Sequence, residues 1–259
     1  MVDLRGVKKV YEQRDKSVLA VDNVTFHVEA GSFVSIVGPS GCGKSTLLLA
    51  IAGIMPVDDG TIMIDGKSVA GRDSAAQLLG MVFQRPVLLP WRSVLQNVLF
   101  PIEILIANGT LRGSFRPYRE RAAELLDMMG LMEFKDSYPR ELSGGMQQRV
   151  SICRSLVYDP PIILMDEPFG ALDAFTRLRL NRELLEIWEK SAKTILFVTH
   201  SLDEAVYLSD KVVVFSPRPG TVREILDVDL ARPRSNDLRN SPRYHELVSR
   251  AYSHFRDLL

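Results

Sequence analysis

The feature that most constrains the fold is the octapeptide GPSGCGKS at residues 38–45, together with what flanks it. The apolar run FVSIV at residues 33–37 comes directly before it and predicts a buried strand. Residues 44–52 have helix-forming composition and end at Gly53, a residue suited to the end of a helix. The chain must therefore contain a unit of strand, glycine-rich turn and helix, which is the context required by the pattern GxxxxGK[ST].

The residue types of this turn suit a polyphosphate. Three glycines, Gly38, Gly41 and Gly43, let the backbone approach an anion closely. The N–H groups and the positive dipole end of the following helix face the same place. Lys44 adds a point charge for the β and γ phosphates of ATP, and Ser45 adds a hydroxyl ligand for Mg²⁺. A glycine-rich turn without function is the alternative, but it leaves the lysine and the serine unexplained.

Composition bounds the remaining possibilities. With 259 residues and 46% hydrophobic residues, the chain can bury a substantial core as one large domain or two small ones. Its 32 basic and 32 acidic residues cancel, so charge gives no support to a nucleic-acid partner. The first nine residues lack the apolar segment of a secretory signal, which predicts a cytoplasmic location. The most membrane-like window, residues 94–107, is too short to span a bilayer, so membrane association would require a partner protein.

The remaining apolar patterns predict an α/β fold with a mainly parallel sheet. Polarity alternates over residues 24–29, which favours an N-terminal antiparallel β subdomain. A second strand pair is expected around residues 58–60, with residues 61–64 running to Asp65-Gly66, because this turn chemistry favours a hairpin. Apolar residues at helical spacing from about 90 to 155 indicate an inserted α-helical subdomain. The continuous apolar runs 161–165 and 194–199 predict buried parallel strands, joined by an amphipathic helix.

Two acidic residues and a histidine follow these predicted strands. Asp166 and Glu167 emerge where an α/β sheet places its ligands. We expect Asp166 to hold Mg²⁺ and Glu167 to orient and deprotonate the attacking water. His200 follows the next strand and precedes SLDE, a capping-box pattern that begins a helix. It is expected at the same edge, as a hydrogen-bond donor to a γ phosphate.

The two cysteines, Cys42 and Cys153, form no disulfide framework, and both are expected to be small buried residues. Cys42 nevertheless lies inside the phosphate loop. The helix end and Lys44 lead us to expect a thiolate there, whose alkylation blocks nucleotide binding.

The chain ends in a polar linker, residues 232–241, and a predicted helix capped by Ser241 with Pro242 at its first position. Its apolar stripe is expected to pack against its own domain rather than to serve regulation. The stripe consists of Tyr244, Leu247, Val248, Ala251, Phe255 and Leu258.

The octapeptide LSGGMQQR at residues 142–149 resembles the signature sequence of ATP-binding cassette proteins. The phosphate loop, Gln84, Asp166-Glu167, Ala171-Leu172-Asp173 and His200 stand in that family's order. The resemblance covers nearly the whole chain. It implies an ATPase domain over residues 1–230, with its helical subdomain at about 90–155, and an appended segment over residues 231–259.

The signature precedes a predicted helix and so offers a second anion-binding helix terminus that lacks a lysine. The resemblance implies that two copies pair head to tail, with the signature of one closing over ATP held by the other. It also implies that Tyr11 stacks on adenine, that Gln84 joins the Mg²⁺ shell and signals to the partner, and that Asp173 couples the two sites. The nucleotide-binding residues are then Tyr11, Gly38, Pro39, Ser40, Gly41, Cys42, Gly43, Lys44, Ser45, Thr46, Ser143, Gly144, Gly145, Gln147 and Asp173. Catalysis falls to Gln84, Glu167 and His200, and Mg²⁺ binding to Ser45, Gln84 and Asp166.

A single motif set and the lack of an inserted coiled coil favour a separate importer subunit. Residues 84–91 and 216–220 resemble the corresponding sequences of importer subunits for nitrate, taurine and aliphatic sulfonates. Similar local sequences occur in subunits for pyrimidine precursors or other small solutes. The implied partners are a second copy, an integral membrane permease and, through it, an extracytoplasmic solute-binding protein. The implied location is the cytoplasmic face of the inner membrane. A phosphate-loop kinase and a cassette ATPase acting on nucleic acid or in assembly are the alternatives.

Overall fold

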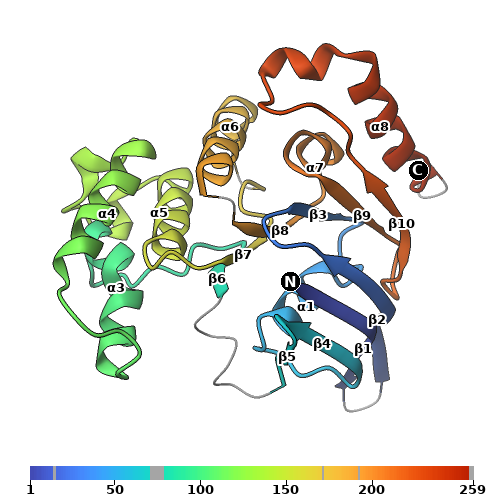
Figure 1. The fold of residues 1–259 in the computed structure, drawn as a ribbon, viewed down its shortest axis with the longest axis horizontal. Coiled ribbons are helices and arrows are strands. Elements are labelled where there is room, and N and C mark those ends of the chain that lie inside the picture. Colours follow the sequence, from blue (N-terminus) through green and yellow to red (C-terminus); the bar gives the residue numbers. More distant parts are fainter. Residues whose placement is uncertain (14–15, 71–78, 171, 192, 257–259) are drawn as a thin grey trace.

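A six-stranded sheet forms the centre of the protein, with strand order β10-β9-β3-β8-β7-β6 (Figure 1). All neighbouring strands are parallel except β9 and β10, which are antiparallel. The computed structural model describes the whole chain except residues 14–15, 71–78, 171, 192 and 257–259. The strands are β3 (Phe33–Val37), β6 (Leu79–Val82), β7 (Ile162–Asp166), β8 (Thr194–Thr199), β9 (Lys211–Phe215) and β10 (Val222–Asp227).

A second, antiparallel sheet contains β1 (Val2–Gln13), β2 (Lys16–Val28), β4 (Asp59–Ile64) and β5 (Lys67–Ser68) in the order β2-β1-β4-β5. The strand expected at residues 61–64 is confirmed as part of β4, and the chain reverses at Asp65-Gly66, where both residues have positive φ. The strand pair expected around residues 58–60 is wrong, because β4 begins at Asp59 and pairs with β1. Gly60 serves a close approach, since a Cβ there would lie 2.4 Å from the Gly6 carbonyl oxygen.

Helix α1 (Lys44–Ile51) packs against β7 and β8 of the central sheet and against β2 of the second sheet. Alternate residues of β3 point to opposite faces. Val34 and Ile36 join the apolar core shared with α1 and the antiparallel sheet, whereas Phe33 and Val37 join the core beneath the other helices. Both faces of the sheet are thus covered, which explains the continuous apolar runs and confirms the predicted α/β class.

The helical subdomain lies beside the β6 edge of the central sheet (Figure 1). It contains α3 (Val94–Ala107), α4 (Arg116–Met128), α5 (Gly144–Leu156) and the 3₁₀ turns η1 (Met132–Phe134) and η2 (Pro139–Glu141). The expected apolar stripe Leu125, Leu126, Met129 and Leu131 is buried in its core. Among the described residues, no helix is both long enough and apolar enough to cross a membrane.

Helices α6 (Ala174–Ser191) and α7 (Leu202–Leu208) cover the face of the central sheet opposite α1. The C-terminal segment contains η3 (Asn236–Asn240) and α8 (Pro242–Ser253), and both contact α7. Tyr244 and Leu247 of the expected stripe are buried against this domain, and Ser241 caps α8. Leu258 lies outside the described residues.

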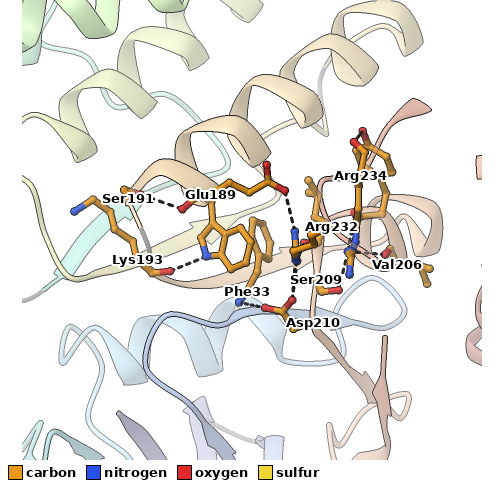
Figure 2. Close-up of polar contacts among 12 residues, drawn as sticks. Phe33, Glu189, Ser191, Lys193, Val206, Ser209, Asp210, Arg232 and Arg234 are labelled. Atoms are coloured by element: carbon orange, nitrogen blue, oxygen red, sulfur yellow. Dashed lines mark hydrogen bonds and ion pairs between the residues drawn. The ribbon is translucent and has the colours of Figure 1, made fainter. Parts of the chain in front are cut away.

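The expected polar linker is fastened to the domain by its arginines (Figure 2). Arg234 is buried and donates to the carbonyls of Val206, Tyr207 and Ser209 at the end of α7. Arg232 pairs with Asp210, whose other carboxylate oxygen accepts from the backbone N–H at the start of β3. These bonds to helix-end carbonyls and to the Asp210 carboxylate hold the segment against the domain.

Candidate active site

The phosphate loop connects β3 to α1 and needs its glycines for two different reasons. Gly41 and Gly43 have φ of 73° and 103°, a region that residues with a side chain avoid. At Gly43 a Cβ would also lie 2.6 Å from the Ala20 carbonyl oxygen, whereas at Gly41 it would meet nothing within 4 Å. Gly43 is therefore fixed by the neighbouring β2 backbone, and Gly41 by conformation alone.

Lys44 is held over this loop by the loop's own backbone. Its side chain is buried, and Nζ donates to the carbonyls of Gly38 at 2.8 Å and Pro39 at 2.9 Å. No carboxylate in the described part of the chain forms an ion pair with it. A buried ammonium without a countercharge is stabilised by an anion, so the loop suits a polyphosphate.

The end of β7 lies next to the start of α1. Ser45 Oγ donates to Asp166 Oδ1 at 2.8 Å. Burial raises the pKa of the Asp166 carboxyl, the hydrogen bond from Ser45 opposes that rise, and the charge of Glu167 adds to it. A cation would offset both the burial and the repulsion, and a hydroxyl, a carboxylate and the nearby amide of Gln84 are the oxygen donors that Mg²⁺ prefers. These residues fit a magnesium ion.

Glu167 brings three predicted residues together. Its backbone has φ of 42°, an unusual value for a residue with a side chain, and its N–H donates to the Val198 carbonyl. Its Oε2 lies 3.1 Å from His200 Nδ1 and 3.4 Å from Gln84 Nε2. Strain held in place by neighbouring strands is frequent where a side chain must face a reacting group.

Glu167 and Gln84 open onto one cavity of about 340 Å³, which Asp166 and His200 do not line. Tyr11 forms part of its wall, with its hydroxyl 3.0 Å from Thr46 Oγ1. The predicted site residues that line it are Tyr11, Ser40, Gly41, Gly43, Lys44, Ser45, Thr46, Gln84 and Glu167. Val18, Ala20 and Arg218 line it as well, although none of them was among the predicted site residues.

Arg218 reaches the cavity because its turn packs on the phosphate loop. A Cβ at Gly220 would lie 2.1 Å from the Cys42 carbonyl oxygen, so no other residue permits this approach. Gly220 also exchanges backbone hydrogen bonds with β2, donating to Ala20 and accepting from Asp22. A basic residue inside a proline- and glycine-rich turn was the available signal, but the turn lies far from the loop in sequence.

The expected thiolate at Cys42 is wrong. The side chain is 1% exposed, and burial raises the pKa of the thiol, which outweighs the effect of Lys44. Cys153 is buried as expected, and burial raises its pKa to about 12.

The signature residues do not line this cavity. Ser143 caps α5 by accepting from Met146 N–H, and Gln147 donates its amide to the carbonyls of Pro139 and Leu142. Gly144 opens α5, and a Cβ there would meet nothing within 4 Å. Asp173 accepts from Thr176 N–H at the start of α6, while Ala171 of the same motif lies outside the described residues. One chain therefore carries two separate sets of predicted nucleotide contacts.

A parallel sheet, a phosphate loop and a carboxylate pair at the adjacent strand end define a phosphate-loop nucleoside triphosphatase. Residues 21–170 match the family described as ABC transporter, and the chain belongs to this family.

Its relatives agree with this assignment. The chain is 40% identical to the aliphatic sulfonates import ATP-binding protein SsuB of Bacillus cereus, over 98% of this chain and 95% of that protein. It is 46% identical to the taurine import ATP-binding protein TauB of Rhizobium johnstonii, over 90% and 87%. Among solved structures, a dimeric post-hydrolysis state of the ATP-binding cassette MJ0796, bound to ADP and phosphate, is similar with a TM-score of 0.79 at 34% identity, covering 89% of this chain and all of that one.

Proposed function

We propose that this chain is the ATP-hydrolysing subunit of an importer for taurine or aliphatic sulfonates, with nitrate as a related candidate. The observation that carries the ATPase assignment is the convergence of Gln84 and His200 on one oxygen of Glu167 beside the phosphate loop. The substrate class rests on the likeness to SsuB and TauB.

ATP hydrolysis requires binding of the phosphates, stabilisation of their negative charge and a base that accepts a proton from water. Lys44 and the loop N–H groups hold the β and γ phosphates. Ser45, Asp166 and Gln84 would hold Mg²⁺, which would neutralise charge on the phosphate oxygens. Glu167 accepts the proton of the attacking water, and His200 orients that carboxylate and donates to the γ phosphate.

The second set of predicted nucleotide contacts, the signature residues, serves the ATP that is bound to a second copy of the chain. Ser143, Gly145 and the start of α5 form a helix terminus that faces no phosphate loop in its own chain. In a head-to-tail dimer this terminus closes over ATP held by Lys44 of the other copy, with Tyr11 against adenine and Asp173 between the sites. The dimeric state of MJ0796 supports the pairing of two such chains. ATP then drives closure by binding the closed state more tightly.

A permease partner is supported by an apolar groove of about 500 Å³ between β6 and α3. Val87, Leu89, Phe100 and Ile104 line the groove, and Trp91 near them in sequence is 70% exposed. Exposed apolar surface of this kind is typical of interaction sites. The permease holds the chain at the cytoplasmic face of the inner membrane and receives its substrate from an extracytoplasmic solute-binding protein. Residues 1–230 form the ATPase domain and residues 231–259 an appended segment.

Co-purification tests this proposal. The full-length chain, tagged and extracted from membranes in mild detergent, is expected to bring down an integral membrane subunit. Vesicles carrying that complex are expected to hydrolyse ATP faster when taurine or an alkanesulfonate is supplied with the binding protein. Transfer of phosphate to a small acceptor, or stimulation by nucleic acid without a membrane partner, would instead support the kinase or the non-transport alternative.

A further inference from the structure

His200 is flanked on both sides by hydrogen bonds that end on Glu204. Thr199 Oγ1 donates to Glu204 Oε2 at 2.6 Å and accepts from Ser201 N–H at 3.0 Å. Glu204 N–H in turn donates to Ser201 Oγ. Glu204 is 6% exposed, so these bonds are shielded from water. They fix the backbone immediately before and after the imidazole.

Arg177, near the start of α6, faces Glu204 without completing a hydrogen bond. Arg177 Nε lies 3.7 Å from Glu204 Oε1, and both atoms are buried and lack a hydrogen-bond partner. Buried, oppositely charged groups without a hydrogen bond lower the stability of the folded state. A shift of roughly 0.5–1 Å would bring these two atoms within hydrogen-bond distance. The contact is therefore poised to respond to a small movement of α6.

The start of α6 is linked to the signature. Arg177 also donates through Nη2 to the Leu172 carbonyl at 3.1 Å. A Cβ at Gly145 would lie 2.9 Å from Leu172 Cδ2, so the signature residues at the start of α5 pack directly on Leu172. A chain of contacts thus runs from Gly145 through Leu172 and Arg177 to Glu204.

We propose that Arg177 and Glu204 are positioning residues that couple the signature of a chain to His200 of the same chain. The inference rests on the proposed ATPase dimer. When the signature loop closes over nucleotide bound to the other copy, Leu172 moves with it and Arg177 completes its bond to Glu204. The completed bond then restrains Glu204 and, through Thr199, the position that His200 already occupies beside Glu167. The bond exists in the closed state and not in the open one, which is the differential contact that coupling requires.

Steady-state ATP hydrolysis by the full-length chain tests this proposal with two single variants, their combination and one control. Glu204→Gln keeps the shape of the side chain but removes its charge, and Arg177→Met removes the guanidinium. Each is expected to lower kcat about tenfold and to bring the Hill coefficient for ATP toward one, with ATP affinity unchanged. The double variant should lose no more than the larger single loss, because both remove one interaction. Glu186→Gln, at an exposed ion pair on the same helix, is the control and should behave as the unmodified chain.

Arg177→Lys is expected to restore part of kcat and of the cooperativity, which a packing role would not produce. Should Glu204→Gln fail to fold, Arg177→Met and Thr199→Val carry the test. Full additivity of the losses, or an unchanged Hill coefficient in the folded variants, would overturn the coupling while leaving the ATPase assignment intact. An unmodified dimer without ATPase activity would overturn both.

Discussion

His200 Nδ1 lies 3.1 Å from Glu167 Oε2, on the side chain that follows the buried strand β7. The neighbouring strand β8 ends one residue before His200, so the parallel register of two strands brings this pair together. This contact restricts the orientation of the Glu167 carboxylate, which lines the cavity and can accept a proton from water there.

Glu167→Gln is expected to lower kcat for ATP hydrolysis by about 10²- to 10⁴-fold, the range for loss of a general base. ATP affinity should remain within about twofold, because the phosphate contacts come from the loop and Lys44. Phosphate release and equilibrium binding of a fluorescent nucleotide measure the two quantities. Near-normal turnover in this variant would rule out the assigned base.

Gly43→Ala and Gly41→Ala separate the two demands on the phosphate loop. Both place a side chain at positive φ, which costs about 1–3 kcal/mol of backbone strain. Only Gly43→Ala also forces a Cβ against the Ala20 carbonyl, so its free energy of unfolding should fall further. Denaturant melts compare the two variants, and equal losses would show that the contact with β2 is not limiting.

Arg218→Ala is expected to weaken nucleotide binding about three- to tenfold, with ATP and ADP affected similarly. The reason is its position on the wall of the cavity, where an exposed cation attracts the polyphosphate. Arg223→Ala, an exposed arginine of β10, serves as the control. Titration calorimetry at two salt concentrations measures the effect, and equal affinities for the two variants would remove Arg218 from the site.

Cys42 should react slowly with iodoacetamide at neutral pH. Because burial raises the pKa of its thiol, the reactive thiolate is scarce, and the rate should rise about tenfold for each pH unit in the range below that pKa. A Cys153→Ser background isolates the signal, which mass spectrometry can follow. A fast reaction at pH 7 that does not increase with pH would indicate a thiolate after all.

The elements predicted best are those whose signal is local. Strand β3, helix α1 and the glycines between them follow from neighbouring residues, because a continuous apolar run and a left-handed turn are both encoded there. Arg218 was missed because its turn reaches the phosphate loop only through the packing of Gly220 on Cys42, which depends on the pairing of β9 with β3. The thiol of Cys42 was misjudged because only the packed structure shows that burial outweighs the charge of Lys44.

The nucleotide site shared between two copies is tested most directly by the mass in solution of the Glu167→Gln chain. Light scattering measures this mass with and without ATP and Mg²⁺. We predict a single chain of 29.1 kDa without nucleotide and twice that mass with ATP. Adding Ser143→Arg should return the mass to that of one chain while ATP still binds. A Glu167→Gln chain that remains monomeric at saturating ATP, or a Ser143→Arg variant that dimerises equally well, would contradict a site shared between two copies.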